Sequence, residues 1–100
     1  MSSDGSAGVD FVQAQLRSHA ERLSRLADSL TAIRATRVSA EGEVTAVVDG
    51  NGTLRELRLS GAISAMTPAE FERIVVDTAL SAARAAFAQQ AAMIEEFNTV

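Results

Sequence analysis

The sequence contains no cysteine, lysine, tryptophan or tyrosine, and these absences exclude several kinds of function. Without cysteine there is no disulfide, no thiolate metal ligand and no thiol nucleophile. Binding of single-stranded nucleic acid by base stacking is disfavoured, because there is no tryptophan or tyrosine and because Phe71, Phe87 and Phe97 lie at the spacing of a helix core. The single histidine, His19, accompanies no metal-ligand or nucleophile motif, so we predict no enzyme, no catalytic residues, no metal site and no cofactor.

Long apolar runs are also missing. The longest are only a few residues, far short of the roughly 20 that span a bilayer. The N-terminus has neither the basic segment nor the apolar core of a signal peptide, so we expect a cytoplasmic protein with no membrane partner. One hundred residues fit a single domain with a small core, and association of copies is a common way to bury more apolar surface.

Positive charge is concentrated in one segment. The net charge is −4, from nine arginines and 13 acidic residues. Residues 11–37 hold five of the arginines and two acids, whereas residues 38–100 hold four arginines and nine acids. A strong nucleic-acid binder usually carries a basic patch that dominates the charge of its domain, and this acidic chain has one basic segment instead.

Residues 11–35 carry the pattern of a long helix with a narrow apolar seam. Asp10 is a candidate N-cap, and seam residues then recur at alternating spacings of four and three. The seam consists of Val12, Leu16, His19, Leu23, Leu26, Leu30 and Ile33. A heptad repeat of this kind is typical of a coiled-coil-like contact, so we expect a helix or dimer seam in which His19 has a core or register role.

The segment before this helix is short and polar. Its residues are mainly serine, glycine, alanine and aspartate, with little that a core would bury. We therefore expect residues 1–9 to form a disordered tail and residues 10–98 to form the single domain.

The arginines of the first helix divide into two groups. Arg17 and Arg25 lie three or four residues from Glu21 or Asp28, a spacing that favours ion pairs along a solvated helix face. The others have no such partner, and we take them, with two more from the β-rich segment, as candidates for contacts with DNA phosphates. The candidates are Arg22, Arg34, Arg37, Arg55 and Arg58. The alternative for each is a solvated surface position.

Residues 38–60 contain three β-rich segments separated by two glycine turns. Residues 43–49 alternate between the two faces of a strand, with Val44, Ala46 and Val48 on one face and Thr45 and Val47 on the other. The turns are Glu41-Gly42 and Asp49-Gly50-Asn51-Gly52, whose residues tolerate positive φ. We predict three antiparallel strands in meander order, with outer strands that are exposed edges able to pair with another chain.

A second long helix is predicted from Pro68 to about Phe97. Thr67-Pro68-Ala69-Glu70 combines an N-cap, a proline in the first position and a capping box. One apolar stripe contains Phe71, Ile74, Val75, Thr78, Ala82, Ala86 and Met93, and the other contains Val76, Leu80, Ala83, Phe87, Ala91 and Ile94. Two stripes need two neighbours, which we expect to be the sheet and either the first helix or a second subunit.

The whole pattern resembles the YbaB/EbfC family of small bacterial nucleoid-associated proteins. The resemblance covers about residues 11–97 and depends most on the two glycine turns at matched spacing between Val38 and Leu59. The Thr-Pro-Ala-Glu helix start and the alanine-rich helix after it add to it. It implies an α+β fold in the order α-β-β-β-α and a homodimer joined through the β region, with long helices projecting like tweezers. It also implies DNA binding with modest sequence preference.

Two functions are consistent with these features. The first is that of a non-enzymatic, dimeric, nucleoid-associated protein that contacts DNA phosphates weakly and with little sequence specificity. Its partners would be a second copy of the chain and double-stranded DNA, in the cytoplasm. The alternative is a protein-interaction module of the same fold that has lost DNA binding. It would act through a helical protein partner or a heterodimer, which the acidic balance and the heptad seam favour.

Overall fold

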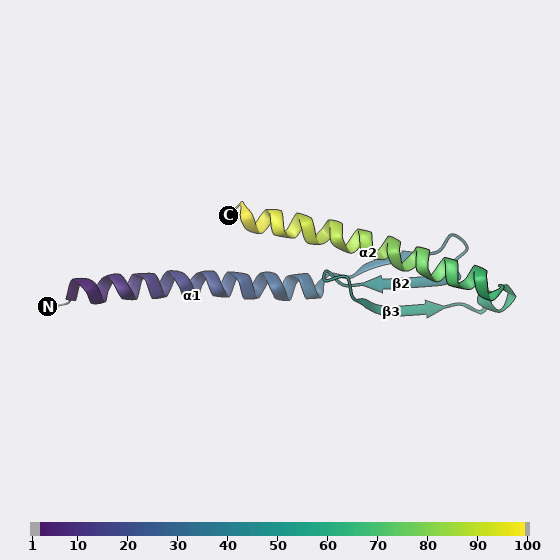
Figure 1. Cartoon of the computed structure of the whole chain (residues 1–100), viewed down its shortest axis with the longest axis horizontal. Coiled ribbons are helices and arrows are strands. Elements are labelled where there is room, and N and C mark those ends of the chain that lie inside the picture. Colours follow the sequence, from purple (N-terminus) through teal and green to yellow (C-terminus); the bar gives the residue numbers. More distant parts are fainter. Residues whose placement is uncertain (1–2, 100) are drawn as a thin grey trace.

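The computed structural model describes residues 3–99, with side chains described from Gly8 onward, and its element order is α-β-β-β-α. The elements are α1 (Ser3–Ala32), β1 (Ala35–Val38), β2 (Val44–Val48), β3 (Leu54–Leu59), the short 3-10 helix η1 (Gly61–Ala65) and α2 (Pro68–Asn98). The molecule is elongated, 81 by 20 by 16 Å, because α1 extends far beyond the sheet (Figure 1). The predicted α+β class and element order are confirmed.

Helix α1 differs from its predicted bounds at both ends. It begins at Ser3 rather than at residue 11, so the expected tail is helical from Ser3 onward, while Met1 and Ser2 lie outside the described residues. Once a helix is nucleated, each further residue adds a backbone hydrogen bond, and α1 therefore extends on the N-terminal side beyond Val12, the first residue of its seam. At the other end α1 stops at Ala32, because Ile33 and Arg34 turn the chain into β1.

The three strands form an antiparallel sheet in the order β1-β2-β3, as predicted. Gly42 and Gly52, one in each connecting turn, have φ values of 77° and 84°, where residues with a side chain are strained. The pairing of β2 with β3 shifts between Val47 and Val48, which leaves Arg55 as the extra residue of a β-bulge. The bulge turns Arg55 out of the regular alternation of β3.

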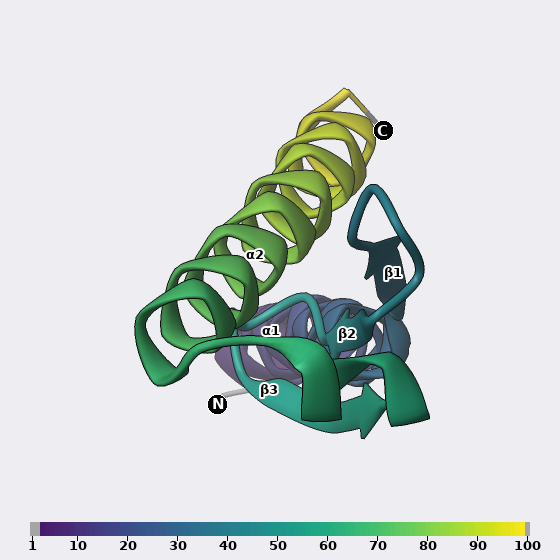
Figure 2. The ribbon, with the colours of Figure 1, turned by 90° about the vertical axis from the view of Figure 1, so that its right-hand side faces the viewer.

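Helix α2 covers one face of the sheet. Its start matches the prediction, since the Thr67 hydroxyl accepts from Glu70 N–H and the Glu70 carboxylate accepts from Thr67 N–H. The helix packs across β1 and β2 and hardly reaches β3. Figure 2, a view along the molecule, shows α2 on one side of the sheet only. The core between them consists of Ile33, Ala35, Ala46, Val48, Ala82 and Ala86.

The β2–β3 turn is wedged between the two long helices. Gly50 N–H donates to the carbonyl oxygen of Leu30 in α1 (3.0 Å), and Gly50 O accepts from the Gln90 amide of α2 (2.9 Å). A Cβ on Gly50 would lie 2.2 Å from the Leu30 oxygen, and one on Gly52 would lie 2.7 Å from the Phe87 ring. Both glycines are therefore required by close approach, and the turn fixes the two helices relative to the sheet.

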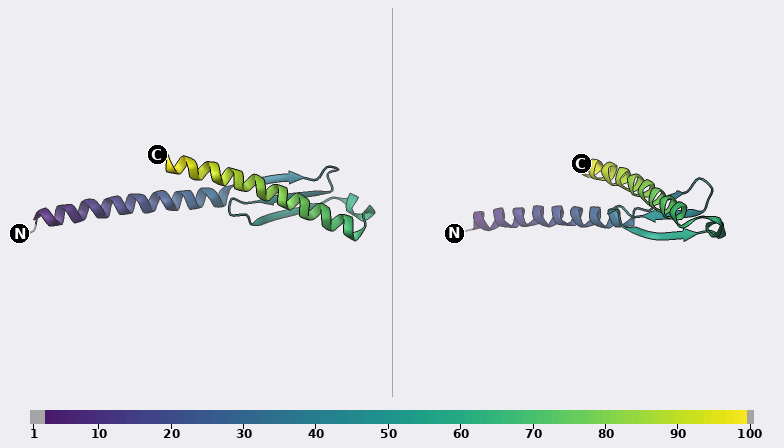
Figure 3. Two further views of the ribbon diagram at one scale, coloured as in Figure 1. Left: turned by 45° about the horizontal axis from the view of Figure 1, so that its top comes forward. Right: turned by 45° about the vertical axis from the view of Figure 1, so that its right-hand side comes forward.

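Beyond this turn the two helices separate. They run in opposite directions, and both views of Figure 3 show α1 continuing well past the C-terminal end of α2. Of the α1 seam, Ile33 is buried and Leu26 and Leu30 are half-buried. The remaining members are exposed: Val12, Leu16, His19 and Leu23. Only the last three of the seven predicted seam residues are thus covered within one chain.

Candidate nucleic-acid interface

The five arginines predicted to contact phosphate do not form one patch. Arg22 lies on α1, Arg34 lies between α1 and β1, and Arg37 lies on β1. Arg55 and Arg58 lie on β3. Each guanidinium has an intramolecular partner, so a phosphate would compete with an existing contact at every one of these positions.

Arg22 is held by the last turn of α2. Its Nη2 atom donates to the carbonyl oxygen of Phe97 (3.4 Å), and its guanidinium carbon lies 4.8 Å from the centre of the Phe97 ring. His19, one turn earlier, has its ring 6.5 Å from the same phenylalanine ring. The contact combines a charge-assisted hydrogen bond with a cation–π interaction, and it leaves Arg22 half-buried.

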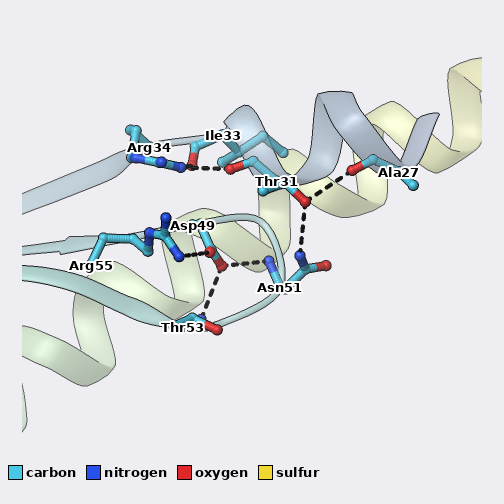
Figure 4. A network of polar contacts seen from close by, with 8 residues as sticks. All are labelled: Ala27, Thr31, Ile33, Arg34, Asp49, Asn51, Thr53 and Arg55. Atoms are coloured by element: carbon cyan, nitrogen blue, oxygen red, sulfur yellow. Dashed lines mark hydrogen bonds and ion pairs between the residues drawn. The ribbon is translucent and has the colours of Figure 1, made fainter. Parts of the chain in front are cut away.

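Arg34 and Arg55 both lie near a buried carboxylate, that of Asp49 (Figure 4). Arg34 donates to the carbonyl oxygens of Thr31 (2.6 Å) and Ile33 (2.8 Å), which satisfies acceptors at the end of α1. Arg55 pairs with Asp49 across 3.6 Å. The structure therefore brings these two arginines, 21 positions apart in the chain, to one end of the sheet.

Asp49 organises this end of the molecule. Its Oδ1 atom accepts from the backbone N–H groups of Asn51 (2.9 Å) and Thr53 (3.0 Å). Burial opposes ionisation of the carboxyl group, but these N–H groups, and then Arg55 and Arg34, outweigh it and lower the pKa of Asp49. The site consequently carries a fixed negative charge that neutralises part of the positive charge around it.

Arg37 lies on the free edge of β1, beside a groove between that strand and α2. It donates to the carbonyl oxygen of Thr36 (3.0 Å). The groove also contains Arg73, Asp77 and Glu43, so it carries both signs of charge. The hydroxyl of Ser39, then backbone N–H groups acting against burial, lower the pKa of Glu43. This mixture is unlike the uniformly basic surface that a phosphate backbone requires.

Arg58 forms an ion pair with Glu56 on the same strand. The hydrogen bond to Arg58 lowers the pKa of Glu56, and the same bond raises the pKa of Arg58. Both side chains are exposed, at 65% for Arg58 and 46% for Glu56, so the pair contributes little to stability. It reduces the positive potential of β3 without removing Arg58 from solvent.

Two arginines outside the predicted set also lie next to candidates. Arg25 lines the space between α1 and the end of α2 together with Arg22, and Arg73 lines the groove beside Arg37. Sequence spacing assigned Arg25 to ion pairs with Glu21 and Asp28. Among residues 8–99, however, the ion pairs are those of Arg55 and Arg58. Arg22 and Arg25 are three residues apart, which places both on the same side of α1, and this spacing is visible in the sequence.

Exposed apolar side chains lie on the outer stripe of α2 and on β3. The outer stripe of α2 is exposed at Val76 (48%), Leu80 (49%) and Phe87 (47%). All six residues of β3 are exposed, including the leucines at 57 and 59 on the face that α2 covers elsewhere. Exposed contiguous apolar surface of this kind marks an interaction site.

The two edges of the sheet differ in their backbone groups. The backbone N–H of Ser60 donates to the carbonyl oxygen of Glu43 in the pairing of β3 with β2. Inward and outward backbone groups alternate along an antiparallel strand, so Leu57 and Leu59 direct their N–H and C=O groups away from β2. Ser39 donates to Val44 O, and by the same alternation Thr36 and Val38 direct theirs outward from β1. At β1 the Arg37 side chain occupies the Thr36 oxygen, whereas no side chain of residues 8–99 donates to an outward carbonyl of β3.

The sequence pattern of the YbaB/EbfC DNA-binding family matches residues 7–99, nearly the whole chain. The chain belongs to the YbaB/EbfC DNA-binding family. A DNA-binding, non-enzymatic role is therefore the one that membership indicates, and the resemblance drawn from the glycine turns is confirmed. A comparison with curated proteins finds no match.

The fold has a solved counterpart. The crystal structure of the uncharacterized protein HP0035 from Helicobacter pylori is similar, with a TM-score of 0.71 and 14% sequence identity. The match covers 85% of this YbaB/EbfC chain and 90% of the other. At that identity the likeness shows the fold alone.

The described part of this YbaB/EbfC protein has neither a membrane-spanning helix nor a cluster of metal ligands. Residues 3–99 contain no helix that is long and apolar enough to cross a membrane. Among residues 8–99, no three histidine or acidic side chains come together as a metal site would require.

Proposed function

We propose that this YbaB/EbfC protein is a homodimer that binds double-stranded DNA weakly, through phosphate contacts and with little sequence specificity, in the cytoplasmic nucleoid. The observation that supports a dimer most directly is the uncovered half of the sheet. There the backbone groups of β3, its leucines and the outer stripe of α2 are all exposed on one side of the molecule.

Antiparallel pairing of β3 with β3 of a second copy satisfies these features together. It joins the two sheets into one of six strands, and the outward backbone groups of Leu57 and Leu59 gain partners. A two-fold axis between the strands also brings the two α2 helices onto the same face of the sheet. Their outer stripes, with Val76 and Leu80, then cover the exposed leucines.

Phosphate contact is supported by the kind and position of the basic residues. All are arginines, whose planar guanidinium binds phosphate through two parallel hydrogen bonds. Arg34, Arg37, Arg55 and Arg58 are exposed although locally bonded. A dimer doubles their number, but the acidic total of the chain opposes DNA, so affinity is low and falls steeply with salt.

Two measurements test the proposal. Light scattering at tens of micromolar is expected to give the mass of two chains, and a monomer would contradict the dimer. Fluorescence anisotropy with a short labelled duplex at low salt is expected to give micromolar binding that is independent of sequence. The triple variant Arg22→Ala, Arg34→Ala and Arg37→Ala should weaken this binding and flatten its salt dependence.

The triple variant has a matched control in Arg84→Ala, which removes an exposed arginine from α2 outside the candidate set. Equal losses in the two variants would contradict specific phosphate contacts at the candidates. A dimer that binds no duplex at low salt would favour the alternative, a protein-interaction module. The exposed α1 seam at Val12 and Leu16 is the surface that supports this second function.

A further inference from the structure

The C-terminal end of α2 lies on the most basic part of α1. Phe97 contacts Arg22 through both its carbonyl oxygen and its ring, and Glu96 lines the same space as Arg22 and Arg25. Glu95 and Glu96 are the last acidic residues of the chain. The negative end of the α2 dipole adds to their charge. The carbonyl oxygen and ring of Phe97 therefore occupy a position on Arg22 that a DNA phosphate would also occupy, with Glu96 beside them.

The contact is a poor candidate for a purely structural role. The buried core beneath α2 is centred on Ala82 and Ala86, in the middle of the helix, and the turn at Gly50 already fixes both helices. Arg22 is the one α1 residue before Leu26 that is half-buried, while every neighbour on α1 from Gly8 to Glu21 is exposed. Arg22 is thus the outermost residue of α1, counted away from the sheet, that α2 covers.

We propose that the last turn of α2 is an intramolecular inhibitor of DNA binding, in which Phe97 and the adjacent glutamates hold Arg22 away from phosphate. The inference rests on the proposed function and adds a regulated state to it. DNA must displace the Phe97 contact before Arg22 binds a phosphate. The measured affinity is then reduced by the fraction of molecules in which Arg22 is covered.

The test compares duplex binding by the full chain and by Phe97→Ala, in the anisotropy assay at low salt. The variant is expected to bind about threefold to tenfold more tightly, in line with the strength of a partly buried cation–π contact. Phe11→Ala is the matched control, because it removes an exposed phenylalanine (63%) from α1 and should leave affinity unchanged. Circular dichroism checks that both variants keep the helical content of the full chain.

A double variant shows whether the gain comes from Arg22. The gain from Phe97→Ala should disappear when Arg22→Ala is combined with it, because the released guanidinium is then absent. A gain that persists in the double variant overturns the proposal. A second variant, Glu95→Gln with Glu96→Gln, keeps the aromatic contact and is expected to bind more tightly by a smaller factor.

The lack of cysteine allows a direct measurement of the movement. Dyes attached through Ser18→Cys and Asn98→Cys, both exposed positions, report the distance between α1 and the end of α2. Added duplex should increase this distance in the full chain. Duplex binding without any affinity gain in Phe97→Ala overturns the inhibitor and leaves the proposed function intact. No binding by any variant overturns both.

Discussion

The two halves of the sheet differ in whether other parts of the chain cover them. On the β1 side, α2 lies over the strand, the β2–β3 turn is wedged between both helices, and Arg37 occupies an edge carbonyl. On the β3 side, neither the strand edge nor its leucines are covered. The covered half contains the hydrophobic core of one chain. The uncovered half has apolar side chains and free backbone groups like those of a core, but nothing in the same chain packs on them. Substitutions in the first should therefore unfold the chain, and those in the second should separate a dimer.

The largest expected effect is in the covered half, at Gly50. Gly50→Ala places a Cβ 2.2 Å from the Leu30 oxygen and breaks the hydrogen bond between them, so the free energy of unfolding should fall by about 2 to 4 kcal/mol. Urea unfolding followed by circular dichroism measures it. Gly61→Ala is the control, since its Cβ meets no atom within 4 Å. Similar losses in both variants would contradict the wedged position of the turn.

The alanine core should give the next largest effect. Ala82 is fully buried against the sheet, and Ala82→Leu adds volume where none is available, at a cost of about 1 to 3 kcal/mol of unfolding free energy. Ala88→Leu makes the same change at an exposed position of the same helix and should be close to neutral. Thermal unfolding of the two variants at one protein concentration makes the comparison. An unchanged midpoint for Ala82→Leu would mean that α2 lies less tightly on the sheet.

The uncovered half should respond in association rather than in folding. Leu57→Asp places a charge at the centre of the proposed interface, and the dimer dissociation constant should rise at least about tenfold, or 1.4 kcal/mol. Val38→Asp is the matched change on the other edge, where Val38 is 58% exposed, and it should leave the dimer intact. Sedimentation equilibrium distinguishes them. A dimer lost through Val38→Asp and kept with Leu57→Asp would exchange the roles of the two edges.

The smallest effect is expected for the charge of the Asp49 carboxylate, in the turn at the end of the covered half. The pKa of Asp49 is lowered in the folded chain, so its carboxylate stabilises the fold at neutral pH, and this contribution is lost as pH falls through the folded pKa. Asp49→Asn should be less stable than the natural chain at neutral pH, with a difference that shrinks in acid. Unfolding free energies across that pH range measure it. A constant difference would mean that packing, not charge, gives Asp49 its role.

Arg55→Ala sharpens the same measurement. It removes the ion pair but keeps the two backbone N–H groups that Asp49 accepts from, which contribute more to the lowered pKa. The pH-dependent part of the stability should therefore decrease without disappearing. Complete loss in Arg55→Ala would identify the ion pair as the dominant partner.

Much of the fold could be predicted from local patterns. The capping box at Thr67, the glycine turns and the two stripes of α2 each depend on residues close in sequence, and each is found in the structure. The start of α1 was missed, because residues 3–9 have no periodic apolar pattern and the helix simply propagates into them. The bulge at Arg55 was missed too, because it comes from a register shift against β2.

The candidate site was predicted less well, for a reason visible at Arg22. Spacing along α1 shows that Arg22 has no acidic neighbour one turn away, and this is correct. Its partner is Phe97, 75 residues later, and no local rule connects the two positions. Arg34 likewise is bonded to carbonyl oxygens at and just after the end of α1, because the chain turns there into β1. The partner of a long, flexible arginine side chain depends on which segments the tertiary structure brings next to it.

The sequence by itself determined which residues form helices and strands, which faces are apolar and that the chain belongs to a DNA-binding family, because these follow from periodicity, turn chemistry and a family-wide pattern. Only the tertiary structure decided which apolar stripe of α2 is inside, which half of the sheet is left open and which arginine is covered. Two stripes of similar hydrophobicity are equivalent until the helix crosses the sheet at a particular position. Here the crossing is set by a glycine turn between two helices.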